Sequence, residues 1–340
     1  MRHRTKNHSQ EIVVVGSLNA DLVVTTPRFP APGQTVVGQH VRVFPGGKGA
    51  NQACAAARLG ASVSMIGRIG RDAHGQLLLR SLASAGANVE GVQRDPRVPT
   101  GVASILTNAA GENQIIIVPG ANGVLRPHHL RPAHRLITSA RVLLLQLEIP
   151  LAVTAAAAQF ARRAGTLVVL DPAPARRLPD RLLACVDYLT PNETELAILT
   201  GCTSRRCSLR EVERLARGLC RHGPKNVIVK LGGRGALLVS PDRTRHWPAF
   251  PVKAVDTTAA GDAFNGAFAW ALAAGQSEAE AGRLAAAAAA CSVTHAGAQP
   301  SMPSMLEVQR LLRRFARTSV GPRYQSLPEH LQLASSQFAR

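Results

Sequence analysis

The chain has 340 residues, of which 46% are hydrophobic and only 4% aromatic. This length and composition suit one large α/β domain with an appendage, in which aliphatic helices pack on buried strands. The formal net charge of +19 raises nucleic-acid binding as a possibility. Arginine is scattered over many expected helices, however, and few aromatic residues are available to stack on bases. We therefore expect affinity for anions such as nucleotide phosphates, and no specific nucleic-acid recognition.

The cysteines form no CxxC pair and show no histidine spacing typical of zinc. We expect them to be reduced, mostly buried small residues of a cytoplasmic protein. The run IVVVG is too short for a signal peptide or a membrane span, and the alanine tract 285–290 is too weakly hydrophobic, so no membrane association is expected. The six cysteines are Cys54, Cys185, Cys202, Cys207, Cys220 and Cys291.

In chain order, residues 1–10 are polar and basic and are expected to form a disordered tail. The apolar run IVVVG precedes a helix expected from about Gly49, and SVSMIG precedes one from about Ala73. The runs RVLLLQLE, TLVVLDP, DYLTPN and NVIVKLG follow, each with helical or turn signals after it. Continuous apolar strands separated by helices predict a three-layer, doubly wound, mostly parallel sheet in a domain over 11–318. Residues 319–340 lack a sustained apolar period and are expected to form a flexible tail.

Two segments, 22–44 and 100–118, interrupt this alternation. Each combines β-prone residues with turn residues, and neither contains a helical pattern. We expect them to form a small inserted β-sheet. Because ligands of open α/β folds bind beyond the carboxyl ends of the strands, this sheet could act as a lid over a site there.

The sequence contains neither a Walker-type phosphate loop nor a GxGxxG after a strand. The stretch FPGGKGANQA offers another way to hold a ligand: its glycines allow close approach, while Lys48 and Asn51 supply polar groups at a helix start. A plain strand-to-helix turn explains this stretch equally well.

Polar side chains also follow several expected strands. Asn19 and Asp21 follow the first strand and Glu148 ends LQLE, so each could bond ligand hydroxyls. In TPNETE, Asn192 and Glu195 are spaced to face one ligand. Asx turns and helix caps are the competing explanations, and a hairpin explains the glycine turn of KLGGRGAL.

The strongest signal is VDTTAAGDAFNGAF. Ala259, Ala260 and Gly261 are too small to shield their amides, so at a helix N-terminus they could present N–H groups to a phosphate. Asp262 would lie beside that anion. A base next to an anion hole is what phosphoryl transfer to a hydroxyl needs, although an aspartate in a first turn commonly only stabilises the helix dipole.

Together, GSLNAD, GGKGANQA, LLQLE, DPAPAR, TPNETE, LGGRG, VDTTAAGDAFNGA and THAGAQPSMP resemble, in this order, the motifs of the ribokinase/PfkB-type carbohydrate kinase family. The resemblance covers roughly residues 11–316, and the combination is highly specific. It implies a ribokinase-like kinase domain that phosphorylates D-ribose at O5 with ATP.

The resemblance also implies roles for residues. Asp262 is the expected general base, and Ala259, Ala260 and Gly261 are the expected anion hole. The expected sugar contacts are Asn19, Asp21, Gly47, Lys48, Asn51, Glu148 and Asp262. The expected ATP contacts are Asn192, Lys230, Leu231, Gly232, Gly233, Arg234, Gly235 and Gly261. Asn192 and Glu195 would organise Mg²⁺ indirectly. An activating K⁺ would lie at Asp256, Thr258, Ser292, His295, Gly297 and Ser301. A homodimer would form through the β-lid.

Three points remain open from the sequence. Ala286 stands where relatives often carry the asparagine that meets adenine, which leaves the base contacts in doubt. The substrate could be deoxyribose, another small sugar or a nucleoside. A non-catalytic anion- or RNA-binding protein on the same fold is a further alternative, although a binder has no need of a base such as Asp262.

Overall fold

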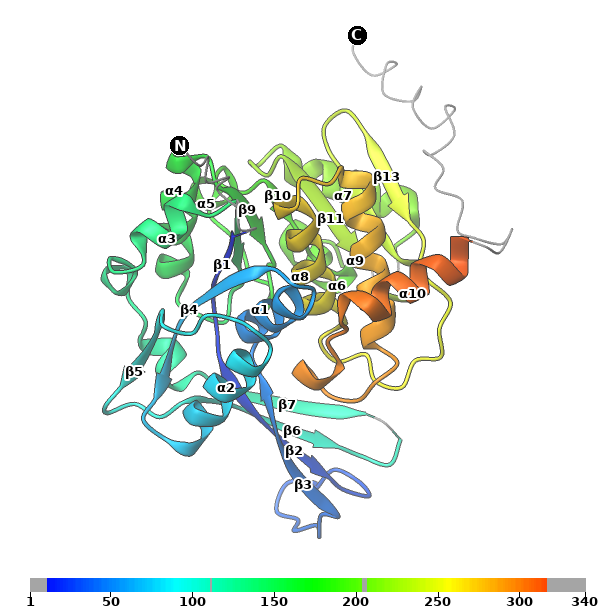
Figure 1. Ribbon diagram of the computed structural model, residues 1–340. Helices are drawn as coiled ribbons and strands as arrows, with labels where there is room; N and C mark the ends of the chain where they lie inside the picture. Colours follow the sequence, from blue (N-terminus) through cyan, green and yellow to red (C-terminus); the bar gives the residue numbers. More distant parts are fainter. Residues whose placement is uncertain (1–10, 111, 204–206, 317–340) are drawn as a thin grey trace.

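The computed structural model describes residues 11–110, 112–203 and 207–316 (Figure 1), so the expected tails 1–10 and 319–340 lie outside the described residues. Its large sheet runs in the order β13-β12-β11-β10-β9-β8-β1-β4-β5. The pairs from β11 to β5 are parallel, and β12 and β13 add an antiparallel edge. The strands are β1 (Glu11–Val15), β4 (Ser62–Gly70), β5 (Val92–Asp95), β8 (Val142–Leu145), β9 (Leu167–Leu170), β10 (Tyr188–Leu189), β11 (Asn226–Lys230), β12 (Ala236–Val239) and β13 (Thr244–Trp247).

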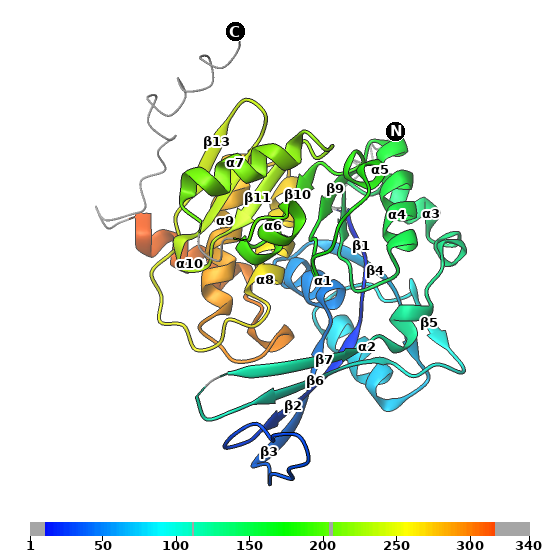
Figure 2. The ribbon, with the colours of Figure 1, turned by 180° about the vertical axis from the view of Figure 1, so that it is seen from behind.

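Helices cover both faces of this sheet, as the continuous apolar strands predict. In β1, Ile12 and Val14 belong to one core cluster, whereas Val13 and Val15 belong to the other. The first cluster is covered by α1 (Lys48–Arg58), α2 (Ala73–Ser84), α8 (Ala260–Ala273), α9 (Glu278–Ser292) and α10 (Met305–Ala316), which lie in front in Figure 1. The second is covered by α3 (His134–Ser139), α4 (Leu151–Ala164), α5 (Asp180–Leu183), α6 (Glu193–Thr200) and α7 (Leu209–Cys220). These helices lie on the side nearer the viewer in Figure 2, where the molecule is seen from behind. The predicted three-layer fold is confirmed.

A second sheet has the order β3-β2-β6-β7 and projects from the end of the large one (Figure 1). Its strands are β2 (Asn19–Thr25), β3 (His40–Gly46), β6 (Gly101–Thr107) and β7 (Asn113–Val118). This separate small sheet is the one predicted. It extends beyond the predicted 22–44 on both sides, because β2 continues almost directly from β1 and β3 leads straight into α1.

Close packing of α1 on α8 depends on Gly266. A Cβ at this position would lie 2.6 Å from the Cβ of Ala55 and 2.8 Å from the carbonyl oxygen of Gln52, so a larger residue would push the helices apart. This close packing also sets the distance between α1 and the start of α8, where Asn51 and Gln52 of α1 donate hydrogen bonds to Asp262.

The cysteines are less buried than the sequence predicts. The cysteines were expected to be mostly buried, but only Cys54 is; the other five are half-buried, because they lie on helix flanks and in loops. None of the six forms a disulfide. In the part of the chain that the structure describes, no helix is both long and apolar enough to span a bilayer.

Candidate active site

A cavity of about 790 Å³ lies where the large sheet, the small sheet and the start of α8 meet. Polar side chains reach it from the carboxyl ends of β8, β9 and β11, as expected for an open α/β sheet. Residues of the small sheet, among them Ile115 and Ile117, form part of its wall. The predicted residues that line it are Asn19, Asp21, Gly47, Lys48, Asn51, Glu148, Asn192, Glu195, Lys230, Gly232, Gly233, Gly235, Thr258, Ala259, Ala260, Gly261 and Asp262.

Asp262 lies in the first turn of α8 and is 4% exposed. Its carboxylate accepts hydrogen bonds from Asn51 Nδ2 and Gln52 Nε2, each at 3.0 Å. Burial raises the pKa of Asp262, opposed by Lys48 and assisted by the negative charge of Asp171. A buried carboxylate whose proton affinity is raised is suited to accept a proton from a substrate hydroxyl.

The start of α8 has an unusual backbone. Ala259, at the N-cap, has φ 59° and is the one non-glycine residue with positive φ among the described residues. Such a conformation costs about 1 kcal/mol or more, and backbone strain of this kind concentrates at functional sites. The amide of Ala260 donates to Thr257 O at 3.3 Å, whereas helix geometry gives Gly261 and Asp262 N–H groups no intrahelical acceptor. These amides and the helix dipole favour an anion here.

Lys48 is a cation that lines the cavity. Burial disfavours its charged form, but Asp262, Asp171 and Glu148 more than compensate and raise the pKa of Lys48. Lys48 therefore stays protonated and offsets the negative charge of these carboxylates.

Glu148 and its neighbours form the end of the cavity nearest the small sheet. Its Oε2 accepts hydrogen bonds from Ser17 Oγ at 2.6 Å, the Lys48 amide at 3.1 Å and Asn19 Nδ2 at 3.4 Å. Asn19 in turn accepts from Asn122 Nδ2 at 2.8 Å. This end is thus an array of oriented donors and acceptors, which suits a polyhydroxylated ligand.

Asp21 lies on β2 and also lines this end. Burial, together with the charges of Glu148 and Asp262, raises the pKa of Asp21 to about 7. Its protonation therefore changes within the physiological pH range.

Gln52 and Asp171, to which the sequence analysis assigns no role, connect Asp262 with Lys230. Gln52 Nε2 donates to Asp262 Oδ1 and Asp171 Oδ2, each at 3.0 Å, and its Oε1 accepts from Gln146 Nε2 at 2.6 Å. Asp171 Oδ1 pairs with Lys230 Nζ at 3.0 Å. Asp171 comes directly after the apolar strand β9, and this position could have indicated a role in the site. Gln52 carried no such signal.

At the opposite end, the turn Gly232–Arg234 follows β11. A Cβ at Gly261 would lie 3.2 Å from Lys230 Nζ, so glycine lets the start of α8 approach this lysine. Two of the predicted nucleotide residues do not line the cavity: Leu231 is 3% exposed in the second core cluster, and Arg234 pairs with Glu193 outside it.

Asn192 and Glu195 form a reciprocal cap at the start of α6. Asn192 Oδ1 accepts from the Glu195 amide at 2.8 Å, and Glu195 Oε2 accepts from the Asn192 amide at 2.7 Å. Burial raises the pKa of Glu195, although Lys230 opposes it. Asn192 and Glu195 therefore cap α6 and also line the cavity. The remaining wall is apolar and includes Ala286.

The six residues predicted to hold potassium come from three stretches of the chain: the segment before α8, the end of α9 and the segment between α9 and α10. Asp256 accepts hydrogen bonds from the amides of Thr258 at 2.9 Å and Gly297 at 2.8 Å, which ties the two loops together. Burial opposes ionisation of Asp256, but these hydrogen bonds lower its pKa overall. Ser292 and Ser301 are buried, and each hydroxyl donates to a carbonyl of its own loop or helix. His295 meets Thr294 Oγ1 through Nδ1 at 3.0 Å.

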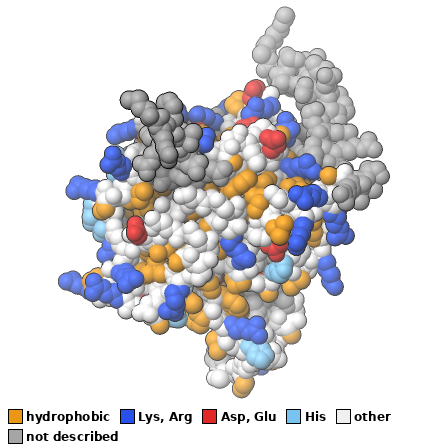
Figure 3. All heavy atoms as spheres, viewed as in Figure 1, with side chains coloured by type: hydrophobic (Ala, Val, Ile, Leu, Met, Phe, Trp, Pro, Cys, Tyr) orange, Lys and Arg blue, Asp and Glu red, His pale blue; other side chains and the backbone are white. Residues whose placement is uncertain are grey.

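A larger cavity of about 1190 Å³ lies over α7 and β13, and none of the predicted site residues lines it. Arginines outnumber carboxylates along its wall, and one of them, Arg217, is paired with Glu213 at 2.7 Å. Figure 3 shows Lys and Arg spread over the face in view, as the scattered sequence positions predict.

Comparisons with known proteins agree with this geometry. Residues 9–305 match the pfkB family carbohydrate kinase model. The chain is 42% identical to a ribokinase of Haemophilus influenzae, over 88% of this chain and 98% of the relative. It is 40% identical to a deoxyribokinase of Salmonella typhi, over 89% and 98% of the two chains. The structure of Arabidopsis thaliana ribokinase complexed with ribose and ATP superposes with a TM-score of 0.85 at 37% identity, over 89% and 98%. The chain therefore belongs to the pfkB family of carbohydrate kinases.

Proposed function

We propose that this chain is a ribokinase, which transfers the γ-phosphoryl group of ATP to O5 of D-ribose and yields D-ribose 5-phosphate and ADP. The observation that carries the proposal is the position of Asp262: a buried carboxylate of raised pKa, in the first turn of α8, between the polyol-binding end and the glycine turn. The relatives named above, both the curated ribokinase and the ribose- and ATP-bound structure, support the same substrate pair.

In the reaction, Asp262 accepts the proton of the ribose 5-hydroxyl as O5 attacks the γ-phosphorus, and the bond from that phosphorus to the bridging oxygen of ADP breaks. The amides at the start of α8, from Ala259 to Gly261, face the charge of the transferring group. The positive charge of Lys48 opposes the effect of burial and so favours the ionised form of Asp262.

Ribose binds at the end formed by Asn19, Asp21, Gly47, Lys48, Asn51 and Glu148. Carboxylates accept from hydroxyls, and Lys48 donates to them. The small sheet closes over this end and excludes water, which would otherwise compete as acceptor of the phosphoryl group.

ATP binds along Lys230 and the turn Gly232–Gly235, with its base against the apolar wall at Ala286, where contact is by packing. Asn192 and Glu195 offer oxygen atoms that suit a hydrated Mg²⁺ ion. When bound with ATP, Mg²⁺ neutralises phosphate charge. Both residues stay fixed by their mutual hydrogen bonds, so they hold this end of the nucleotide site in place.

Asp256, Thr258, Ser292, His295, Gly297 and Ser301 would hold an activating K⁺ ion. Carboxylate, hydroxyl and carbonyl oxygens are the donors that hard cations prefer, and the low pKa of Asp256 keeps its charge available. A K⁺ ion bound by these residues would add positive charge near the start of α8. If the assignment is right, kcat falls when potassium is replaced by sodium or choline; an unchanged kcat would contradict it.

A homodimer through the small sheet is part of the proposal. The strand register places Leu22, Val43 and Ile116 on the face turned away from Asp21, and Val41 and Val118 continue that face. Val41, Val43, Ile116 and Val118 are 68%, 40%, 64% and 56% exposed, an apolar face that a second copy could cover.

The substrate is tested by a competition assay between D-ribose and 2-deoxy-D-ribose, with other small sugars and nucleosides as further acceptors. ADP release gives kcat/KM, and phosphorus NMR identifies the phosphorylated hydroxyl. Sites that hydrogen-bond a hydroxyl discriminate strongly against an analogue that lacks it, so we expect a higher kcat/KM for ribose. The deoxyribokinase relative makes the comparison necessary, and a higher kcat/KM for deoxyribose would replace ribose as the assigned substrate.

A further inference from the structure

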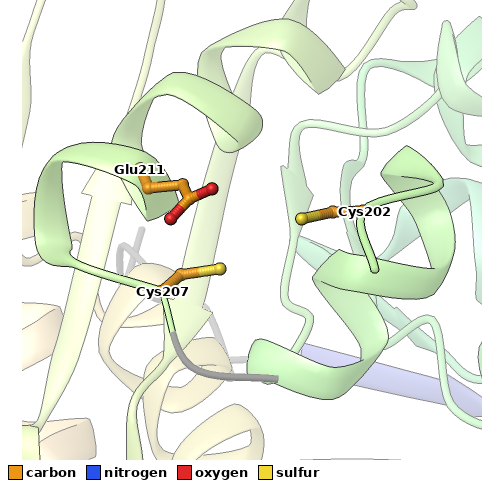
Figure 4. Close-up of side chains that lie close together, drawn as sticks. All are labelled: Cys202, Cys207 and Glu211. Atoms are coloured by element: carbon orange, nitrogen blue, oxygen red, sulfur yellow. The ribbon is translucent and has the colours of Figure 1, made fainter. Parts of the chain in front are cut away.

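Outside the cavity of the kinase site, two thiols and a carboxylate converge between α6 and α7. Cys202 Sγ, Cys207 Sγ and one carboxylate oxygen of Glu211 all lie within 4.8 Å of one another. Figure 4 shows the three side chains pointing into one space: Cys202 from the segment after α6, Cys207 from the segment before α7, and Glu211 from the first turn of α7.

Two helix ends hold these side chains in place. The amide of Cys202 donates to the Ala197 carbonyl at 2.9 Å, and Gly201 ends α6 in the left-handed conformation with φ 68°. Ser208 caps α7 by accepting a hydrogen bond from the Glu211 amide at 3.2 Å. The end of α6 thus positions Cys202, and the capped start of α7 positions Glu211 next to Cys207.

We propose that Cys202, Cys207 and Glu211 bind a thiophilic divalent cation of the Zn²⁺ class. Two thiolates and one carboxylate are three of the four ligands that Zn²⁺ takes in tetrahedral sites, with bonds of about 2.3 Å to sulfur and 2.0 Å to oxygen. Ligand atoms of such a site are roughly 3.5 to 4 Å apart, so small side-chain movements complete it. A water molecule takes the fourth position, since all three side chains are only half-buried.

The sequence spacing is Cys-x4-Cys-x3-Glu, which contains neither CxxC nor histidine, and the sequence prediction therefore found no zinc pattern. Two of the three ligands are soft thiolates and one is a hard carboxylate. Mg²⁺ prefers oxygen ligands alone, so it is not the preferred ion of this site. Binding deprotonates both thiols and releases the protons to solvent, so affinity rises with pH.

Nearby arginines favour the anionic ligand set. Arg214 lies 4.0 Å from Glu211, and Arg234 Nη1 donates to the Cys207 carbonyl at 3.3 Å. With the cation bound, two thiolates and one carboxylate leave a net charge of −1, which these guanidinium groups stabilise.

Arg234 also connects the site to the glycine turn, since it ends the Gly232–Arg234 turn and pairs with Glu193 at the start of α6. A cation at Cys207 fixes the carbonyl that Arg234 contacts. This coupling rests on the proposed nucleotide site. Because the bound cation orders only the turn that contacts ATP, metal binding is expected to change the KM for ATP about twofold to fivefold and to leave the KM for ribose unchanged.

Binding is tested on the full chain, reduced, stripped with chelator and exchanged into chelator-free buffer. Co²⁺ serves as the spectroscopic probe, because cobalt bound to thiolate gives charge-transfer absorption, and Zn²⁺ is titrated by displacement. We expect one cation per chain, a rise in Tm with Zn²⁺, and a loss of more than about 100-fold in affinity in Cys202→Ser and Cys207→Ser. Glu211→Gln should weaken binding less and change the visible cobalt spectrum.

Cys185→Ser is the matched control, because Cys185 is also a half-buried cysteine but lies apart from the cluster. It should bind Co²⁺ as the wild type does. Absence of the charge-transfer band in reduced wild type would overturn the proposal, as would binding that survives in the Cys202→Ser/Cys207→Ser double variant. If the pair instead forms a disulfide in air and the reduced form binds no cation, the cluster is a redox pair and the metal assignment is wrong.

Discussion

The large sheet is covered by helices on both faces, whereas the small sheet has one face on the cavity and the other exposed. The difference shows in the side chains: each residue of β8 is fully buried, while each residue of β7 is exposed. Both sheets contribute to the same site, since Glu148 follows β8 and Asp21 lies on β2.

This contrast separates two tasks. Groups that must be held within fractions of an ångström, such as Asp262, lie on elements with dense packing around them. Part of the proposed ribose-binding end, including Asp21, lies on a sheet with little packing of its own, and local stability is lowest where few apolar contacts are made. Changes to the large sheet should therefore reduce kcat, and changes to the small sheet should act on ribose binding and assembly.

The largest effect is expected for Asp262→Asn. The amide keeps the shape and can still accept a hydrogen bond from Gln52, but it cannot take a proton from O5. We expect kcat to fall by about 10²- to 10⁴-fold, measured as ADP release, with ribose binding within a few-fold of wild type by calorimetry.

Asp242→Asn is the control, because Asp242 is a carboxylate in the turn between β12 and β13 and does not line the cavity of the site. A fall in kcat of less than tenfold for Asp262→Asn would remove Asp262 as general base and with it the assignment of the chemistry to the large sheet and the helices packed on it.

A smaller effect is expected for Gln52→Leu, which deletes the link between Asp262 and Asp171. Misplaced catalytic groups lose up to about 100-fold in rate, and we expect roughly 10- to 100-fold in kcat. The hydrogen bond from Gln52 lowers the pKa of Asp262, so its loss raises that pKa and moves the acid limb of the kcat profile to higher pH.

The matched control is Gln76→Leu, since Gln76 is an exposed glutamine on α2. If Gln52→Leu reduces kcat without moving the pH profile, the residue has a packing role and does not tune Asp262.

How much of this site follows from sequence depends on whether a residue is placed by its own strand or by a distant helix. Asn19 and Glu148 follow apolar strands, and sheet topology alone brings strand ends together. Asp171 also follows an apolar strand, so the same argument from sheet topology could have predicted its place in the site. Gln52 was not, because its direction depends on the packing of α1 against α8 at Gly266, a contact between residues more than 200 positions apart.

The same reasoning explains the two residues of the glycine turn that do not line the cavity. A motif marks the whole run from Lys230 to Gly235, yet alternate residues of a strand and its turn point in different directions. Leu231 turns into the core and Arg234 turns toward Glu193. Which residue faces the ligand is decided by packing and ion pairing that the motif does not contain.

For the small sheet, Ile116→Asp places a charge on the apolar face turned away from the cavity. A buried, unpaired charge at an interface is costly, so we expect the proposed dimer to dissociate, measured by sedimentation at micromolar concentration. The KM for ribose should rise up to roughly tenfold, because the freed sheet closes less well, while kcat changes little.

Leu306→Asp is the matched control, since Leu306 is 53% exposed on α10, away from the small sheet. It should sediment as the wild type does. A wild type that is monomeric at micromolar concentration would contradict the dimer directly.

The smallest effect concerns the pH dependence of ribose binding, which we attribute to Asp21 on the small sheet. The pKa of Asp21 is raised to about 7, by burial and by Glu148 and Asp262. Only about a tenth of such a group is ionised at pH 6 and about nine-tenths at pH 8. The carboxylate accepts hydrogen bonds from sugar hydroxyls better than the acid, so the Kd for ribose should fall about threefold to fivefold between these values. Calorimetry measures this, and Asp21→Asn should abolish the dependence while weakening binding.

The raised pKa of Asp21 also determines how the stability of the fold changes with pH. Because the folded pKa of Asp21 lies above its ordinary value of 3.8, the folded state holds the proton more tightly than the unfolded state. Stability is therefore lost as pH rises from about 4 to 7, and the cost persists at pH 8. Asp21→Asn should then raise the free energy of unfolding at pH 8 by roughly 1 to 3 kcal/mol and have little effect at pH 4. A variant that is less stable than wild type at pH 8 would mean that the Asp21 carboxylate is stabilised where it lies, and the pH dependence of ribose binding would then need another group.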